Sequence, residues 1–482
     1  MNASRDAVVA AAAAHFDSAA FVQDLARRVA YRTESQNPAA APALRAYLVQ
    51  EITPTLRALG FDCTLHDNPQ YSTEHAAGPL LIAQRIEDPA LPTVLMYGHG
   101  DVVRGQDAAW QRGAGPWHLV QDGERLYGRG SADNKGQHSI NIAALAVVLQ
   151  HQGGRLGFNL KWLMETGEET GSPGLAQFCR EQQQALAADV LIASDGPRLS
   201  RHLPTVFLGS RGVANFDLAL TLRSGAHHSG NWGGLLRNPG TVLASAIACL
   251  VDGQGVIRVP ALRPPPIPAN VSAALAGLQF GGDDGDPAID VDWGEPGLSP
   301  AQRVIAWNTL EVLAYRCGNP DFPVNAIPAS AQASMHLRFV VGTDVSGLRE
   351  RVQAHLDEHG FAKVQVGPAT VMAATRLDPD NPWVHFCLRS IEHTTGQVPA
   401  LLPNLGGSLP NDVFAHILGL PTVWVPHSYA ACCQHAPDEH LLAPVARQAL
   451  QIMAGLFWDL GVEGAQVLSA AGQRPPFRPP AR

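Results

Sequence analysis

The first 205 residues alternate between short apolar runs and segments whose apolar residues recur at helical spacing. Helical periodicity occurs at residues 44–60 and 139–150. Four apolar runs predict buried strands, at residues 79–84, 93–98, 158–164 and 189–194. Short buried strands that alternate with helices are typical of an α/β sheet with helices on both faces.

The middle of the chain has a different pattern. Residues 214–223 and 329–341 alternate apolar and polar positions, as half-buried strands do. Residues 348–360 predict an amphipathic helix that ends at a glycine. Stretches rich in Pro, Gly and Asp, at 263–270 and 281–287, predict a long surface excursion. These features indicate an inserted α+β domain.

The α/β pattern then resumes, with a helix at 411–419, a buried strand at 422–426 and a closing helix at 441–461. The prediction is therefore an α/β domain with a mixed sheet, split by the insertion. We place its first part at residues 1–205, the inserted domain at 206–376, the second part at 377–465, and a disordered tail at 466–482. A chain of 482 residues is long enough to need two cores.

Composition and charge exclude several classes of protein. The net charge of −9, without a dense Lys/Arg stripe, gives no basis for nucleic-acid binding. No apolar run reaches the roughly 18 residues of a membrane span, and the alanine-rich residues 8–14 predict a helix rather than a signal peptide. Seven cysteines without a C-x-x-C pair indicate neither a disulfide framework nor a thiolate metal site, so we expect a cytoplasmic protein.

Polar residues that could carry chemistry follow the ends of the predicted strands. They are His99 and Asp101, Asp133, Glu168 and Glu169, Asp195, and His435. Each signal alone has an ordinary explanation: a helix N-cap for Asp133, an Asp-Gly turn for Asp195, a solvated loop for the glutamate pair. Adjacent cysteines at Cys432 and Cys433 point in opposite directions and are interpreted as packing residues.

Taken together, these residues predict a metal centre. The carboxyl ends of strands in an open α/β sheet converge on one crevice. Two imidazoles (His99, His435) and three carboxylates suit two divalent metals with one carboxylate between them. Two such ions can activate a water and polarise a scissile carbonyl. Glu168 and Glu169 face opposite ways in extended backbone, so one can bind metal while Glu168 acts as general base.

The motifs resemble those of the co-catalytic two-metal peptidases and deacylases related to carnosine dipeptidase, carboxypeptidase G, aminoacylase, acetylornithine deacetylase and succinyl-diaminopimelate desuccinylase. The resemblance extends over residues 20–462. It implies a zinc-peptidase-like catalytic domain interrupted by a lid and dimerisation domain. It also implies that His99 and Asp195 bind one metal, that Glu169 and His435 bind the other, and that Asp133 bridges them.

Further residue roles come from the same resemblance. Asp101 would orient His99, and the Asp133–Asn134 peptide bond would be cis. His228, in the segment HHSGNWGG, would stabilise the oxyanion, often from the partner subunit, although Ala226 and His227 depart from the usual Asp-Leu. Arg338 would read a substrate carboxylate, helped by backbone donors of a Gly-Gly-Ser loop, namely Gly406, Gly407 and Ser408.

We therefore predict a hydrolase that cleaves an amide bond in a small substrate bearing a free carboxylate. A dipeptidase or carboxypeptidase-like activity is the first hypothesis, and an N-acyl-amino-acid deacylase is the alternative, because both use the same centre. A catalytically inactive binding module is the remote alternative. Zinc is the expected metal, with manganese and cobalt also suited to these ligands. The expected partners are the peptide or N-acyl amino acid substrate and a second copy of the chain.

Overall fold

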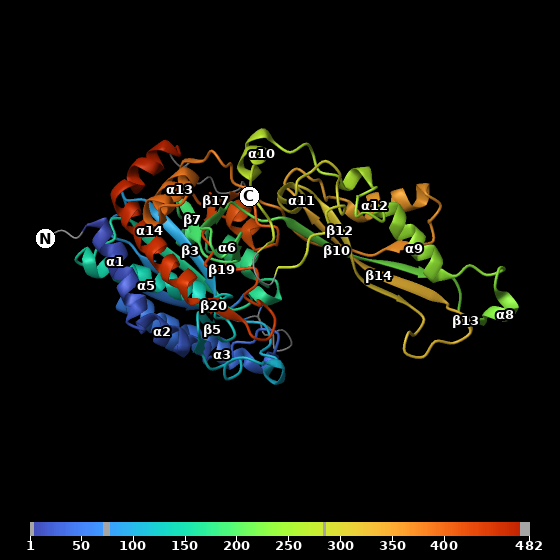
Figure 1. Ribbon diagram of the computed structural model, residues 1–482, viewed down its shortest axis with the longest axis horizontal. Helices are drawn as coiled ribbons and strands as arrows, with labels where there is room; N and C mark the ends of the chain where they lie inside the picture. Colours follow the sequence, from blue (N-terminus) through green and yellow to red (C-terminus); the bar gives the residue numbers. More distant parts are fainter. Residues whose placement is uncertain (1–3, 71–77, 283–285, 473–482) are drawn as a thin grey trace.

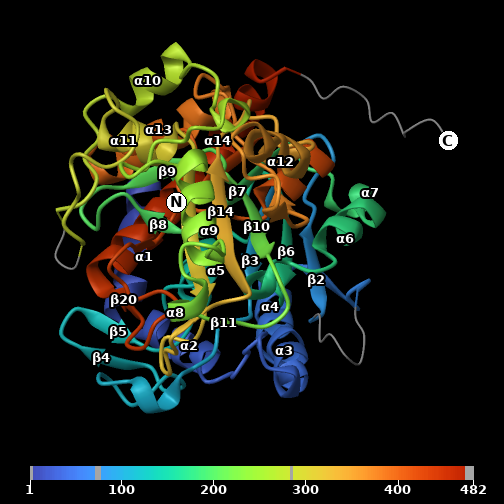
Figure 2. The ribbon, with the colours of Figure 1, turned by 90° about the vertical axis from the view of Figure 1, so that its right-hand side faces the viewer.

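The computed structural model describes residues 4–70, 78–282 and 286–472. Its larger sheet has eight strands in the order β1-β2-β6-β3-β7-β18-β9-β17. A five-stranded sheet has the order β12-β14-β10-β15, with β16 also paired to β10. Figure 1 shows that the smaller sheet projects from the part of the molecule built around the larger one, and Figure 2 views the molecule from the projecting end. The predicted fold class is confirmed.

The predicted apolar runs form the centre of the eight-stranded sheet. In sheet order its strands are β1 (Asp62–His66), β2 (Leu80–Arg85), β6 (Asn159–Glu165), β3 (Thr93–His99), β7 (Val190–Ala193), β18 (Thr422–Trp424), β9 (Thr205–Phe207) and β17 (Ala400–Leu402). The pairs β6–β3, β3–β7 and β7–β18 are parallel, whereas β1–β2 and β2–β6 are antiparallel. The carboxyl ends of β3, β6, β7 and β18 therefore lie at one edge.

Both faces of this sheet are buried, which explains why its strands have continuous apolar runs. Val94 and Met96 of β3 belong to a core cluster shared with α5 (Lys135–His151) and α14 (Ala443–Ala470). Leu95 of β3 points to the other face and packs in a cluster that includes α6 (Leu175–Glu181). The first face also carries α1 (Arg5–Asp17) and α13 (Pro382–Thr395), as Figure 1 shows.

The five-stranded sheet has the half-buried character that its alternating pattern predicts. Its strands are β12 (Thr309–Cys317), β14 (Ser330–Phe339), β10 (Gly212–Thr221), β15 (Gln365–Val366) and β16 (Thr370–Met372), all in antiparallel pairs. Buried and open positions alternate along β10 and β14. The apolar side packs against α9 (Pro239–Leu250) and α12 (Leu348–Glu358).

Three predicted elements differ in detail. The helix expected at 44–60 is divided into α3 (Ala41–Ala46), a short π-helix η2 (Tyr47–Ile52) and α4 (Thr53–Ala58). Pro54 lacks the N–H that would continue the α-helical pattern there. The helix expected at 411–419 is a short π-helix, η6 (Val413–Ile417). Helix α14 continues to Ala470, so the tail cannot begin at residue 466; residues 473–482 lie outside the described part of the chain.

The predicted surface excursion contains short helices: η5 (Pro260–Leu262), α10 (Ala269–Leu275) and α11 (Pro300–Ile305). Among the described residues, no helix combines the length and apolarity that crossing a membrane requires.

The remaining elements are α2 (Ala20–Val29), η1 (Pro38–Ala40), η3 (Asp107–Ala109), β4 (Val120–Asp122), β5 (Arg125–Tyr127), η4 (Glu168–Thr170), α7 (Gln183–Leu186), β8 (Pro197–Arg198), β11 (His227–His228), α8 (Ser229–Trp232), β13 (Ala326–Ile327), β19 (Ser428–Tyr429) and β20 (His440–Leu442).

Candidate metal centre

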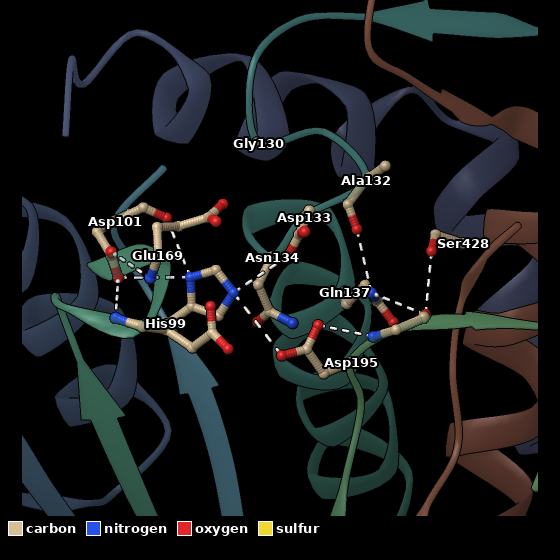
Figure 3. A network of polar contacts seen from close by, with 12 residues as sticks. His99, Asp101, Gly130, Ala132, Asp133, Asn134, Gln137, Glu169, Asp195 and Ser428 are labelled. Atoms are coloured by element: carbon tan, nitrogen blue, oxygen red, sulfur yellow. Dashed lines mark hydrogen bonds and ion pairs between the residues drawn. The ribbon is translucent and has the colours of Figure 1, made fainter. Parts of the chain in front are cut away.

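His99 is the last residue of β3, and its buried ring lies between carboxylates (Figure 3). Nδ1 lies 3.1 Å from the backbone oxygen of Asp101 and 3.4 Å from its Oδ1. Because both of these atoms accept hydrogen bonds, Nδ1 carries the ring proton in the neutral tautomer and Nε2 presents a lone pair. Nε2 lies 3.1 Å from Oδ1 of Asp133 and 3.7 Å from Oδ2 of Asp195.

A second group of donors forms around the other oxygen of Asp133. Nε2 of His435 lies 3.1 Å from Oδ2 of Asp133 and 3.0 Å from Oε2 of Glu169. The two oxygens of Asp133 thus face two different histidines. Asp133 lies just before α5, and its peptide bond to Asn134 is cis, as the resemblance implied.

The residues fit two divalent cations that share Asp133. The ligand atoms of His99, Asp133 and Asp195 lie within 4.8 Å of one another, and so do those of Asp133, Glu169 and His435. Oδ2 of Asp195 is buried and has no hydrogen-bond partner, which a protein interior rarely tolerates. A cation offsets this cost, and mixed nitrogen and oxygen donors suit zinc and similar metals.

The electrostatics of the group point the same way. Burial raises the pKa of Glu168 well above its usual value and raises that of Glu169 to about 7, with the charge of Asp133 adding to the Glu169 shift. Burial and Asp133 also raise the pKa of Asp195 to about 6. Hydrogen bonds to Asp133 and Glu169 raise the pKa of His435 to about 11. The carboxylates repel one another, and positive charge relieves that repulsion.

Asp101 links His99 to the glutamate pair. Its Oδ1 accepts a hydrogen bond from the backbone N–H of Glu168 at 3.2 Å, and its Oδ2 accepts one from that of Glu169 at 3.1 Å. These bonds fix the start of the turn η4, which begins three residues after Glu165, the last residue of β6. The β3–β6 register places His99 level with Glu165, so the loop after β6 lies beside the imidazole. One carboxylate thereby positions the imidazole, the candidate base and a candidate ligand.

Glu439, which sequence reasoning did not single out, joins the Asp133 loop to the His435 loop. Its buried carboxylate accepts hydrogen bonds from the Arg129 guanidinium at 2.7 Å and from the backbone N–H groups of Gly130, Ala132 and Asp133 at 3.0, 2.9 and 3.0 Å. Burial raises the pKa of Glu439, and Arg129 opposes that shift. The only sequence signal was its place in QHAPDE, four residues after His435.

The structure brings the four predicted substrate residues together. Nη1 of Arg338, on β14, donates to Oγ of Ser408 at 2.6 Å, and that hydroxyl donates to the backbone oxygen of Arg211 at 2.6 Å. Nε of Arg211 donates to the backbone oxygen of Gly406 at 2.7 Å. Gly407 completes the loop between Gly406 and Ser408. We call Arg338, Arg211 and residues 406–408 the arginine cluster.

Arg211 is a residue that sequence reasoning missed. Its Nη1 is buried without a hydrogen-bond partner, and burial, with the charge of Arg338, lowers its pKa to about 10. Burial also lowers the pKa of Arg338. Two guanidinium groups at such close range favour an anion between or beside them. The available signal was an arginine directly after a buried run, in SRG at 210–212.

His228 is not brought to this centre within the chain. It is exposed on β11, where its Nδ1 accepts a hydrogen bond from the backbone N–H of Gly230 at 3.1 Å. Its strand pairs with β13. Figure 1 places β13 and α8 at the end of the projecting part that lies farthest from the eight-stranded sheet.

Fold and site together define a metal-dependent hydrolase whose two candidate cation sites share a carboxylate. Residues 95–459 match the peptidase family M20/M25/M40. The chain belongs to this family and is a metal-dependent peptide hydrolase. The resemblance inferred from the motifs is thus confirmed.

Relatives of known name agree with this assignment. The chain is 32% identical over 472 residues to a Beta-Ala-His dipeptidase of Mus musculus, which covers 91% of this chain and 92% of the relative. It is 26% identical over 373 residues to a cysteinylglycine-S-conjugate dipeptidase of Corynebacterium striatum, covering 74% and 77%. The structure of human carnosine dipeptidase 1 matches with a TM-score of 0.75 at 22% identity, over 95% of this chain and 99% of that one. At that identity the structural match shows the fold.

Proposed function

We propose that this protein is a dipeptidase that uses two divalent metal ions to hydrolyse the peptide bond of a substrate with a free carboxylate. The observation that carries the proposal is the pair of donor sets joined by Asp133, in the same chain as the arginine cluster. Relatives named for Beta-Ala-His and cysteinylglycine conjugates support a dipeptide as the substrate class.

His99, Asp133 and Asp195 would hold one ion, and Asp133, Glu169 and His435 the other. Bound ions of this kind lower the pKa of water and polarise a carbonyl. Zinc is the proposed metal, because imidazole and carboxylate are among its usual ligands, and manganese and cobalt accept the same set.

Glu168 is proposed as the general base. It is the first residue of the turn η4, where its backbone N–H donates to Asp101, and it lies close enough to His99 and Asp195 for their charges to affect its pKa. A raised pKa suits a group that takes a proton from the attacking water and then donates it to the leaving amine. Arg338 and Ser408 bind the substrate carboxylate, with backbone donors from residues 406–407.

An N-acyl-amino-acid deacylase is the alternative, since it would use the same centre and the same carboxylate contacts. Hydrolysis by the zinc-reconstituted protein, followed by mass spectrometry, separates the two. We expect turnover of unblocked dipeptides and its loss in Glu168→Gln, a variant that keeps the side-chain shape. Turnover restricted to N-acetyl, N-succinyl or longer N-acyl amino acids would replace the dipeptidase proposal. No turnover at full metal occupancy would favour an inactive binding module.

A homodimer is proposed through the projecting part. Several large apolar side chains are exposed there, among them Leu235, Leu313, Phe322 and Val324. Exposed apolar surface often marks a protein–protein interface where it forms a patch. In such a dimer His228 would serve the partner's site, which is consistent with its distance from the centre in its own chain.

Mixing two inactive variants tests the role of His228. In a heterodimer of Glu168→Gln with His228→Ala, one site would combine an intact Glu168 with an intact His228 of the other chain. Activity restored by mixing supports the proposal. Lack of restoration, with heterodimers demonstrated by mass spectrometry, would mean that His228 acts in its own subunit or has no part in the reaction.

A cytoplasmic location is proposed because all seven cysteines are free thiols.

A further inference from the structure

A cavity of about 630 Å³ adjoins the arginine cluster. Pro197 lies on its wall, two residues after Asp195, so their Cα atoms are at most about 7.6 Å apart. Arg211, Gly406 and Gly407 form another part of the wall. The cavity and the arginine cluster therefore share residues.

Aromatic and aliphatic side chains form much of the remaining wall, beside charged residues such as Arg198 and Arg303. Phe280, Trp293 and Trp307 contribute aromatic rings, and Val304 and Leu405 contribute aliphatic side chains. Pockets lined in this way bind apolar groups, with a few polar atoms fixing the orientation. The size falls within the usual range of small-ligand pockets, roughly 300–1,000 Å³.

Hydrogen bonds hold this wall in place. Helix α11 begins with a reciprocal capping pair, in which Ser299 and Gln302 bond to each other's backbone N–H. The Arg303 guanidinium donates to the backbone oxygens of Val291 at 3.2 Å and Glu295 at 3.1 Å, which fixes the segment carrying Trp293. The side chain of Asn404 donates to the backbone oxygen of Ile305 at 2.9 Å. The cavity is thus largely formed before a ligand binds.

We propose that this cavity receives the side chain of the substrate's carboxyl-terminal residue and favours a large apolar or aromatic one. This inference rests on the proposed dipeptidase function. In a dipeptide, the terminal carboxylate and the neighbouring side chain branch from the same Cα. A carboxylate bound at Arg338 and Ser408 therefore places that side chain beside residues 406–407 and Arg211.

The residues of the wall favour an apolar side chain at the carboxyl-terminal position of the substrate over glycine or an acidic side chain. Glycine at that position would leave the cavity unfilled and its aromatic rings without a contact. An acidic side chain would gain the charge of Arg211 but would face four acidic residues of the same wall, Asp286, Asp290, Glu295 and Glu311. An apolar side chain loses water-exposed surface, at about 25 cal/mol per Å² buried, without opposing charge.

The test compares dipeptides that differ only in their second residue: Ala-Gly, Ala-Leu, Ala-Phe, Ala-Trp and Ala-Asp. With the zinc-reconstituted enzyme we expect kcat/KM for Ala-Phe to exceed that for Ala-Gly by about tenfold or more, since pockets discriminate by this much for a few carbon atoms. Equal rates across the panel, or a preference for Ala-Gly or Ala-Asp, would overturn the assignment.

A variant that fills the cavity sharpens the test. Val304 packs so closely on Gly406 that a Cβ on that glycine would lie 2.8 Å from Cγ1 of Val304. Val304→Phe should reduce the Ala-Phe to Ala-Gly ratio of kcat/KM by about tenfold. Val291→Phe is the matched control, because Val291 is an exposed residue of the segment that carries Trp293. This variant should leave the ratio unchanged. Trp307→Ala, which removes part of the aromatic wall, should lower the ratio as well.

Binding of the free amino acid that forms the carboxyl-terminal half of the substrate separates failure of this inference from failure of the proposed function. Calorimetry on the metal-loaded protein should show tighter binding of free phenylalanine than of glycine, with the difference reduced in Val304→Phe. If no dipeptide is cleaved but this preference holds, the pocket stands and the dipeptidase function falls. If dipeptides are cleaved without the preference, the pocket assignment falls alone.

Discussion

Replacing Glu439 by glutamine should weaken the metal centre without touching any candidate ligand. The carboxylate of Glu439 accepts four hydrogen bonds, one from the Arg129 guanidinium and three from backbone N–H groups of residues 130–133. Glutamine keeps one accepting oxygen and replaces the other with an NH2 group. That group would face donors, and the buried cation of Arg129 would lose its counter-charge.

The magnitude follows from these contacts. Arg129 and Glu439 are both 1% exposed, so water cannot replace the lost partner. Removing one member of a buried ion pair costs about 3–5 kcal/mol. The N–H of Asp133 is among the groups held by Glu439, so the shared ligand would also lose its support. Losses of this kind around metal ligands reduce metal affinity by about 10–100-fold.

Urea denaturation of the metal-free protein measures the first quantity, and competition with a chelator measures the second. Glu463→Gln is the control, because its contact with Arg389 spans 3.6 Å between exposed side chains and should matter by less than about 1 kcal/mol. A Glu439→Gln protein with wild-type stability and wild-type metal affinity would refute the reasoning that this carboxylate supports the Asp133 loop.

Three further predictions concern other parts of the molecule. Arg338→Ala removes the guanidinium 2.6 Å from Ser408 Oγ and should raise KM for dipeptides by about tenfold to a hundredfold, measured by steady-state kinetics; an unchanged KM would contradict carboxylate binding there. Burial and the charge of Asp101 raise the pKa of Glu165 from 4.5 to about 7. Protonated Glu165 therefore stabilises the folded protein fully below about pH 4.5, and this stabilisation is lost as the pH rises to 7. In urea titrations the free energy of unfolding of the metal-free wild type should fall by about 3 kcal/mol relative to Glu165→Gln between pH 4 and 8. Parallel curves for the two proteins would disprove that shift. Arg5→Ala breaks the paired contact with Asp459 that joins α1 to α14, and should lower the free energy of unfolding by about 3 kcal/mol.

The hydrophobic pattern predicted most of the fold because burial on both faces of the large sheet leaves an unambiguous signal. The runs that form β2, β3, β6 and β7 are such cases. The π-helices were not predictable, since η2 has the same apolar spacing as the α-helices on either side of it. The end of α14 was misplaced because the Pro- and Arg-rich sequence at 473–482 resembles a tail and the boundary was set too early, although Val467 is buried against the core.

The grouping of the candidate ligands could be predicted because their chemical types are rare at such positions, whereas residues of common types were missed. Histidine and carboxylate residues directly after strands are uncommon enough to suggest a metal centre, and the structure brings His99, Asp133, Asp195, Glu169 and His435 into two adjoining groups. Arg211 and Glu439 were missed, because their roles depend on contacts between segments more than 190 positions apart in sequence. Such contacts leave no local pattern.

The central claim, that two metal ions sharing Asp133 carry out dipeptide hydrolysis, is tested most directly by a metal titration. Chelator-treated protein is titrated with zinc, and bound metal per chain is measured by mass spectrometry beside the rate of Ala-Phe hydrolysis. We predict that activity reaches its maximum only when two ions are bound per chain, and that Asp133→Asn loses both binding events and activity. Full activity with one ion or none, or an Asp133→Asn protein that keeps two ions and its activity, would contradict the account.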